Sequence, residues 1–308
     1  MRDALLAKID LLASRLKPYQ GFIFLCGGPT DITSVRPVSI RDAIHRELAR
    51  HRDIDDRIRV AEDYKDWSHD AIYRDLVSFE RHLAELSSVI VLVLESPGSI
   101  AELGLFSIID EFKNKLLVFI ETSHYQEDSF IKLGPINYLE KTHNNAAECH
   151  RWTQGRGAGV FDPAAAEQLQ PELAEAIKLR AGKPTPERNF DPKNWLDSAL
   201  LTCDLLGLCS ALTIRELRQL LVGLGCNRSE SEVKQIVFLL ERVGLLTMEP
   251  KGDQRFYISI TEREHVKFTF KDENFDIMRF RSDLLANYAA EDKKRFRAIQ
   301  DVRSRYAA

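Results

Sequence analysis

Residues 89–102, with the sequence VIVLVLESPGSIAE, decide the fold of the N-terminal half of this chain. The first six form a continuous apolar run, which is typical of a strand buried on both faces of a sheet. Proline and glycine at positions 97 and 98 then indicate a turn, and Ser99 with Glu102 has the spacing of a helix capping box. The stretch therefore predicts a buried strand, a polar loop and a helix in direct succession.

The same alternation of strand and helix extends on both sides of this stretch. Strands are expected at residues 22–26, 58–61, 89–94 and 116–120, and helices at residues 1–17, 38–51, 75–86 and 99–112. Such alternation predicts an α/β fold with a parallel sheet that helices cover on both faces. Ligands bind beyond the carboxyl ends of the strands in these sheets, so the loops at residues 27–28, 62–64 and 95–102 are expected to form one site.

The pattern changes after a linker rich in proline at residues 181–192. Three helices are expected to begin near Asn194, Thr213 and Ser229, followed by a hairpin between residues 245 and 260, which is the order of a winged helix. These patterns predict four parts: an α/β domain at residues 1–155, a helix and linker at 156–192, a winged-helix domain at 193–270, and a basic C-terminal helical segment at 271–308.

Composition limits the classes of protein to which the chain can belong. With 308 residues, 44% of them hydrophobic and 29% charged, it can form two domains of ordinary size. The net charge of −4 gives no support for a surface that coats nucleic acid. The apolar run of residues 89–94 is too short to span a bilayer, and no signal peptide is recognisable, so a cytoplasmic location is expected.

The five cysteines are scattered, which argues against a disulfide framework. Around His143, Cys149 and His150 the spacing of a four-ligand zinc site is missing, which favours an ordinary loop. The sequence therefore requires no metal.

The candidate catalytic residue is Glu102, near the start of a helix whose free N–H groups and partial positive charge would face the site. An ionised carboxylate beside a ribose C1′ can stabilise an oxocarbenium-like transition state or attack it. A plain helix cap is an equally simple role for a glutamate at this spacing. The helix is apolar almost all round and is expected to be buried.

The other loop residues are candidates for binding a substrate. Asp63 is a second catalytic candidate, because it could position a sugar hydroxyl or protonate a leaving base; a solvated loop carboxylate is the alternative. The candidate substrate-binding residues are Cys26, Gly27, Gly28, Tyr64, Glu95, Ser96, Gly98 and Ser99. The glycine patterns of dinucleotide-binding folds and P-loops are missing, and so is the nucleophile elbow of serine hydrolases.

Several motifs in order carry a resemblance to a known family. They are residues 23–28 (IFLCGG), 62–63 (ED), 95–99 (ESPGS), 102–104 (ELG), 106–107 (FS), 130–131 (FI) and 134–135 (GP). This set, over residues 20 to 140, resembles retron-associated toxins or effectors with a nucleoside deoxyribosyltransferase-like domain.

The resemblance implies a flavodoxin-like N-terminal fold and cleavage of an N-glycosidic bond, with NAD or a related nucleotide as the substrate. No cofactor is expected besides NAD as the substrate. It implies a complex with a retron reverse transcriptase and its msDNA and RNA, which hold the effector inactive until phage infection. Glu102 falls on the catalytic glutamate of the family. A Tyr-Pro expected before residues 62–63 is replaced by Val60-Ala61, so Tyr64 or Trp67 would have to supply the aromatic contact. Self-association is left open.

The C-terminal half has two interpretations, a nucleic-acid contact and a protein-docking domain. Its expected third helix mixes acidic and basic residues, which suits a phosphate-lined groove poorly. The candidates for contact with nucleic acid or a partner are Arg215, Arg218, Arg228, Lys251, Arg255, Arg295 and Arg297. The alternative for the whole chain is a nucleotide-sensing winged-helix regulator without catalysis, in which Glu102 is only a cap.

Overall fold

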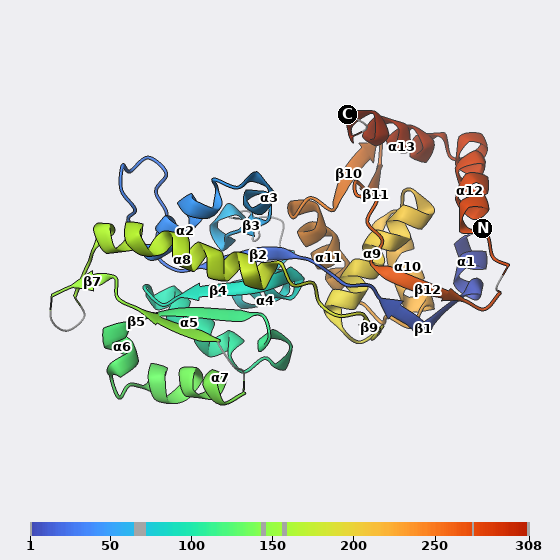
Figure 1. Ribbon diagram of the computed structural model, residues 1–308. Coiled ribbons are helices and arrows are strands. Elements are labelled where there is room, and N and C mark those ends of the chain that lie inside the picture. The colour runs from blue at the N-terminus through green and yellow to red at the C-terminus, as the bar shows by residue number, and fades with distance from the viewer. Residues whose placement is uncertain (1, 65–71, 143–145, 156–158, 273, 307–308) are drawn as a thin grey trace. The chain divides into compact units, whose positions relative to one another are not determined.

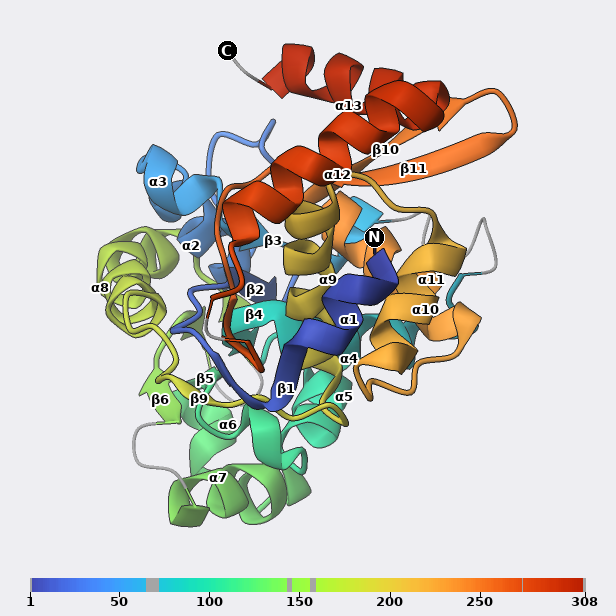
Figure 2. The same ribbon diagram turned by 90° about the vertical axis from the view of Figure 1, so that its right-hand side faces the viewer.

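A computed structural model describes residues 2–64, 72–142, 146–155, 159–272 and 274–306 (Figures 1 and 2). The chain divides into two compact units. The sheet unit contains Gln20–Lys65 and Phe79–Thr185, and the helical unit contains Met1–Tyr19, Asp66–Ser78 and Pro186–Ala308.

Five parallel strands form the centre of the sheet unit, in the order β3-β2-β4-β5-β6. Its elements are β2 (Phe22–Cys26), α2 (Ile40–Leu48), α3 (Arg52–Asp55), β3 (Ile58–Arg59), η1 (Ala61–Tyr64), α4 (Leu76–Leu86), β4 (Ser87–Val93), α5 (Pro97–Phe106), η2 (Asp110–Phe112), β5 (Leu116–Glu121), α6 (Thr122–Gln126), η3 (Lys132–Ile136), α7 (Asn137–Thr142), β6 (Ala147–His150), β7 (Thr153–Gln154), β8 (Val160–Phe161) and α8 (Pro163–Ala181). The predicted α/β class and parallel sheet are confirmed.

The strand order reverses between β2 and β4, so the loops that follow these two strands diverge to opposite faces of the sheet. Open α/β sheets bind ligands at this kind of switch point. The loop after β2 begins at Gly27 and leads to α2, while the loop after β4 begins at Leu94 and leads to α5. The connectivity thus places the two polar loops singled out in the sequence next to each other.

Helices cover both faces of the sheet. One face packs against α2 and α8, and Figure 1 shows α8 lying along the strands; the core on this face includes Ile23, Val91 and Phe119. The other face packs against α5, where the rings of Phe24 and Phe106 lie 6.4 Å apart. Each fully buried large apolar side chain stabilises such a core by about 1.5–3 kcal/mol.

The helical unit contains the three predicted helices and the hairpin. Its elements are α1 (Arg2–Lys8), β1 (Ile9–Leu16), β9 (Arg188–Asn189), α9 (Trp195–Cys209), α10 (Ile214–Gly223), α11 (Glu230–Arg242), β10 (Leu246–Lys251), β11 (Gln254–Ser259), β12 (Val266–Phe270), α12 (Ile277–Glu291) and α13 (Lys293–Tyr306). The predicted capping boxes at Thr213–Glu216 and Ser229–Glu232 are both present.

The prediction of one N-terminal helix up to Pro18 is wrong. The helix ends at Lys8, and residues 9–16 form β1, which pairs antiparallel with β12 and β9. The pairing joins Ile9 to Phe270 and Leu16 to Val266. The local spacing of leucines is compatible with a helix or with a strand. The strand forms because its hydrogen-bond partners in β12 lie near the other end of the chain.

The expected domain boundaries also need correction. Residues 1–19 belong to the helical unit and not to the α/β domain, whereas α8, expected between domains, contributes to the core of the sheet unit. The predicted basic C-terminal helical segment consists of two helices, α12 and α13, because the chain leaves helical geometry at Asp292. No helix in the described residues is long and apolar enough to cross a membrane.

Candidate functional site

Glu95, the first polar residue after β4, binds backbone groups of two neighbouring segments. Its Oε1 atom accepts hydrogen bonds from the N–H groups of Gly28 and Arg41, both at 2.9 Å, and its Oε2 atom accepts from Ile40 N–H at 2.8 Å. Burial raises the pKa of Glu95, while these three donors act in the opposite direction. The carboxylate expected to bind substrate therefore anchors the start of α2 to the loop after β2.

The two glycines after β2 are required by this packing. A Cβ atom on Gly28 would lie 2.9 Å from the Glu95 carboxyl carbon and 2.9 Å from Ser39 Cβ, and one on Gly27 would lie 2.9 Å from Arg41 Cβ. Real Cβ atoms do not approach so closely. The glycines allow the loop to pass against Glu95 and α2, which by itself explains their presence without a ligand.

The capping box of α5 differs from the one predicted. Ser96 is the N-cap: its Oγ accepts from Ser99 N–H at 3.1 Å, and Ser99 Oγ accepts from Ser96 N–H at 3.2 Å. Ser96 also donates to the Gly27 carbonyl at 3.1 Å. Glu102 lies beyond this box, in the second turn. The interpretation of Glu102 as a helix cap is therefore wrong.

The expectation of a wholly buried helix also needs correction. Leu103 and Phe106 are buried, but Ile100 and Ile108 remain 38% and 71% exposed. Near the start of the helix, Gly98 is exposed, and a Cβ atom there would meet only Ser96 Oγ, at 3.8 Å. Close packing does not explain a glycine at this position.

Glu102 points toward the end of β2, where it lies against the thiol of Cys26. Burial raises the pKa of the Glu102 carboxyl, and the hydrogen bond with Cys26 and the charge of Arg41 partly offset this rise. Its Oε2 atom is buried and has no hydrogen-bond partner among the residues described. A buried carboxyl oxygen without a partner costs about 1–3 kcal/mol, so this atom is free to meet a ligand.

Two further carboxyl groups interact with Glu102: the charge of Glu62 raises its pKa, and its own charge raises the pKa of Glu80. Glu80 on α4 is buried, and burial together with the charges of Glu102 and Glu62 raises its pKa to about 7. Glu62 in η1 forms a two-pronged ion pair with Arg41, at 2.7 and 3.1 Å. The guanidinium of Arg41 is itself buried, and its Nε atom has no partner in the described part of the chain. We call Glu62, Glu80 and Glu102 the carboxyl cluster.

The second predicted loop supplies a different residue from the one expected. Asp63, the predicted catalytic partner, is exposed, and its neighbour Glu62 is the one that interacts with Glu102. Tyr64 is buried against Phe79, with ring centroids 5.8 Å apart, so its ring belongs to the core and not to an open site. Trp67, the other aromatic candidate, lies outside the described residues.

Sequence reasoning missed Glu80 and Arg41. A signal for Glu80 was present: it lies one position after Phe79 and three before Leu83, on the face of α4 that the apolar spacing predicts to be buried. A carboxyl group on such a face needs an explanation. No comparable local signal marks Arg41, because its pairing with Glu62 depends on two separate segments.

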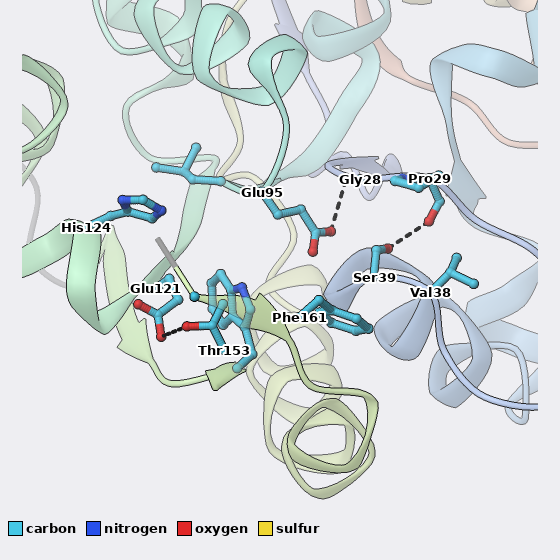
Figure 3. A pocket seen from close by; sticks show the side chains of 12 residues that line it. Gly28, Pro29, Val38, Ser39, Glu95, Glu121, His124, Thr153 and Phe161 are labelled. Atoms are coloured by element: carbon cyan, nitrogen blue, oxygen red, sulfur yellow. Dashed lines mark hydrogen bonds between the residues drawn. The ribbon is translucent and has the colours of Figure 1, made fainter. Parts of the chain in front are cut away.

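A cavity of about 230 Å³ opens beyond the carboxyl ends of β2, β4, β5 and β6 (Figure 3). Its lining includes Gly28, Ser39 and Glu95, together with Glu121 at the end of β5 and Thr153 after β6. A neighbouring cavity of about 190 Å³ lies between the starts of α5 and α6 and shares Leu94, Glu95 and His124 with it. The described residues that line these two cavities do not include Glu102.

Three of the cationic residues predicted for nucleic acid or partner contact are occupied within the helical unit. Arg295 is 4% exposed, pairs with Glu216 at 2.7 Å and donates to the Ala211 carbonyl at 2.8 Å. Arg228 donates to Ser198 and to the Lys193 carbonyl. Lys251 pairs with Glu249 and Asp301. The exposed members of the predicted set are Arg215, Arg218, Arg255 and Arg297.

The third of the three helices predicted for the winged helix, α11, is covered by other residues of the helical unit. Residues 236–240 are all buried, so the helix is packed on every side along this stretch. Gln235 donates to the Ile72 carbonyl at 3.1 Å, and the rings of Phe238 and Tyr73 lie 6.2 Å apart. The hairpin β10–β11 likewise lies against α13, as Figure 2 shows. The ion pairs Lys251–Asp301 and Lys294–Asp253 join the hairpin to this helix.

The residues considered for zinc do not meet in the part of the chain that is described. No group of three or more His, Cys, Asp or Glu side chains there is arranged to hold a metal ion. His143 lies outside the described residues.

Comparison with known proteins points to retrons. The family model described as STM3845 retron effector protein matches residues 37–248. The Escherichia coli protein named "Retron Ec73 putative ribosyltransferase/DNA-binding protein" is 26% identical over 216 residues, 66% of this chain and 66% of that protein. The Escherichia coli protein named "Retron Ec86 putative ribosyltransferase/DNA-binding protein" is 38% identical over 120 residues, 39% of this chain and 37% of that protein. The matches thus span just under two thirds of one relative and less than two fifths of the other.

Proposed function

This chain belongs to the STM3845 retron effector family, and from that premise we propose that it is an N-glycosidase that hydrolyses NAD or a related nucleotide. The two relatives are named as ribosyltransferases, which handle the same bond between a ribose C1′ and a nitrogen base. Transfer of the ribosyl group to water instead of a second base is hydrolysis.

One observation carries the proposal: the half-buried Glu102 is not used as a cap, and its Oε2 atom is buried without a partner among the described residues. As the C1′–N bond breaks, the base leaves with the electron pair and positive charge develops on C1′. The Glu102 carboxylate stabilises that charge or captures C1′, and water then adds to C1′ and releases a proton.

The neighbouring groups have supporting roles in this scheme. Because its pKa is near 7, Glu80 can hold a proton at neutral pH and pass it to a leaving base. Arg41, paired with Glu62, favours the ionised form of Glu102, which the reaction requires. Nicotinamide leaves as a neutral base and needs no proton, whereas an adenine or guanine leaving group does.

The rest of the chain is assigned a regulatory role. We propose a flavodoxin-like sheet unit and a winged-helix arrangement in the helical unit, a cytoplasmic location, and a complex with the retron reverse transcriptase and msDNA that holds the toxin inactive. The exposed cations Arg215, Arg218, Arg255 and Arg297 are the candidates for that contact. The packing of α11 against residues 72–73 favours contact through these surface cations over insertion of α11 into a groove.

The test is nicotinamide release from NAD by purified protein and by two variants. Glu102→Gln removes the ionisable carboxyl at similar volume, and Glu172→Gln, on the exposed side of α8, is the matched control. We expect release by the wild type and by Glu172→Gln and none by a folded Glu102→Gln. Unchanged release by Glu102→Gln would reject the catalytic role. No release by any of the three, with or without the retron partners, would favour a nucleotide sensor without catalysis.

A further inference from the structure

The chain between two members of the carboxyl cluster runs through the helical unit. Glu62 in η1 and Glu80 on α4 belong to the sheet unit, but Asp66–Ser78, which separates them in the sequence, belongs to the helical unit. Helix α4 starts in one unit and continues in the other, because residues 76–78 form its beginning and residues 79–86 its remainder. The position of Glu80 therefore depends on how the start of α4 is held.

Helix α11 holds the chain just before α4. The side chain of Tyr73 is 2% exposed, and its ring meets the ring of Phe238 edge-on, with the centroids 6.2 Å apart. One position earlier, the Ile72 carbonyl accepts a hydrogen bond from the side-chain amide of Gln235 at 3.1 Å. Phe238 lies in the buried stretch of α11 and is a firm support. One apolar and one polar contact thus fix residues 72–73 on α11.

The chain from Tyr73 to Glu80 is short and locally bonded. Asp75 caps the first turn of α4, because its carboxylate accepts hydrogen bonds from the N–H of Ser78 at 2.7 Å and from the Ser78 hydroxyl at 3.2 Å. Backbone hydrogen bonds then join this turn to the next one, which carries Glu80. A displacement of Tyr73 is therefore passed along α4 to Glu80.

A core contact ties the other end of the connection to the same helix. Phe79 is fully buried, and its ring centroid lies 5.8 Å from that of Tyr64 in η1, the short helix that also carries Glu62. Glu62 and Glu80 are thus linked twice, by this contact and by the chain that α11 holds. Movement at the start of α4 consequently affects two members of the carboxyl cluster.

The protonation of Glu80 is sensitive to the position of α4. Its side chain is 7% exposed, and this burial is the main cause that raises its pKa to about 7, with the charges of Glu102 and Glu62 next in importance. If the start of α4 shifts and admits water, the main cause weakens and the pKa of Glu80 falls toward the usual range. A carboxyl group with a lower pKa holds less of its proton at pH 7 and is a poorer donor to a leaving base.

We propose that Tyr73 is a positioning residue through which α11 keeps Glu80 at the carboxyl cluster. The helical unit is thereby coupled to the cluster, so a displacement of α11 changes the chemistry there without any contact with the substrate. The effect on catalysis rests on the proposed function, whereas the placement of Glu80 does not.

Carbon-13 NMR of the Glu80 carboxyl tests the coupling in the whole chain. In protein labelled at the side-chain carboxyl carbons of glutamate, the signal of Glu80 is the one that Glu80→Gln removes. We expect its pKa to fall from about 7 toward the usual range in Tyr73→Leu and in Phe238→Leu. Tyr73→Phe keeps the ring and should titrate as the wild type does. Unchanged titration of Glu80 in both folded leucine variants would overturn the proposal.

Two further variants distinguish the coupling from a general loosening of the helical unit. Phe256→Leu removes another buried ring of this unit, one that packs against Arg295, and is the matched control. It should leave the titration of Glu80 unchanged, and an equal fall of the pKa there would reject the coupling. Gln235→Ala removes only the hydrogen bond to Ile72 and should lower the pKa of Glu80 to a smaller extent. If neither leucine variant folds, wild-type titration in Gln235→Ala rejects the proposal.

Base release by the same proteins separates this inference from the proposed function. At pH 7, Tyr73→Leu and Phe238→Leu should release a purine base several-fold more slowly than the wild type, with a smaller effect on nicotinamide, which needs no proton. Wild-type rates together with wild-type titration of Glu80 would reject the coupling and leave the hydrolysis standing. A shifted titration with no base release by any of the proteins would reject the hydrolysis and keep the coupling.

Discussion

The thiol of Cys26 lies against the carboxyl of Glu102, joining the end of β2 to the second turn of α5. Burial raises the pKa of both groups, that of the thiol well above its usual value, so the thiol keeps its proton and can donate it in a hydrogen bond. A protonated thiol beside a carboxyl favours the ionised form of the carboxyl. The Cys26 thiol thus favours the negatively charged form of Glu102, the residue that we propose as catalytic.

Replacement of Cys26 by alanine should shift the pH dependence of the reaction. The hydrogen bond with Cys26 lowers the pKa of Glu102, so its loss lets that pKa rise. Because the reaction needs the ionised carboxylate, the rising limb of kcat/KM against pH should move to higher pH in Cys26→Ala. The exposed Cys149 provides the control, since Cys149→Ala should leave the profile in place. An unshifted limb in Cys26→Ala would show that the thiol does not act on Glu102.

Glu80→Gln should stabilise the protein at alkaline pH. The pKa of Glu80 is raised to about 7 in the folded protein, above the ordinary value of the unfolded chain. Between these two values the folded state binds the extra proton, so the free energy of unfolding falls as pH rises. The variant removes this effect and should be more stable than the wild type by about 1–2 kcal/mol at pH 8 and by much less at pH 5. Urea denaturation at both pH values measures the difference; equal stabilisation at pH 5 and pH 8 would contradict it.

Glu80→Gln should also affect purine nucleotides and NAD differently as substrates. If Glu80 supplies a proton to the leaving base, Glu80→Gln should slow release of adenine or guanine by about 10²–10⁴-fold and release of nicotinamide far less. The comparison is made with a purine nucleotide and NAD on one preparation, so a general folding defect would slow both reactions equally. An equal loss on both substrates would therefore reject a proton donor role.

Arg295 should be a stability residue and Arg297 should not. Arg295→Ala leaves Glu216 and the Ala211 carbonyl without their partner and should lower the free energy of unfolding by about 3–5 kcal/mol. Arg297 is exposed two positions later, and Arg297→Ala should change stability by less than about 0.5 kcal/mol. Chemical denaturation of the two variants gives the comparison. A stable Arg295→Ala would mean that the ion pair with Glu216 is not formed in solution.

Alanine substitution of Gly28, with Gly104 as the control, tests the close packing of the loop after β2. Gly28→Ala places a Cβ atom against the Glu95 carboxyl and Ser39, and should cost about 1–3 kcal/mol. Gly104→Ala, inside α5, meets nothing within 4 Å and should be neutral or stabilising by up to about 1 kcal/mol. Thermal unfolding distinguishes them. Equal unfolding temperatures for the two variants would argue against the close approach of Glu95 to Gly28.

Several features followed from the sequence by itself because their signals are local. A run of six apolar residues predicts a buried strand wherever its partners lie, and the parallel sheet with its polar loops was found as expected. The capping boxes of α10 and α11 span four residues each and were recognised directly. The likeness to retron effectors also rests on short ordered motifs.

Other features depended on segments that meet only in the folded chain. Residues 9–16 are a strand because β12, more than 240 residues later, supplies the hydrogen-bond partners. Glu62 and not Asp63 interacts with Glu102, because adjacent residues of the short helix η1 point in different directions. Burial of Arg295 against Glu216 and of Tyr64 against Phe79 likewise follows from packing between separate elements. Local sequence determined most of the elements, whereas tertiary contacts decided the strand at residues 9–16 and which polar side chains interact, since strand pairing, burial and charge pairing depend on neighbours distant in the chain.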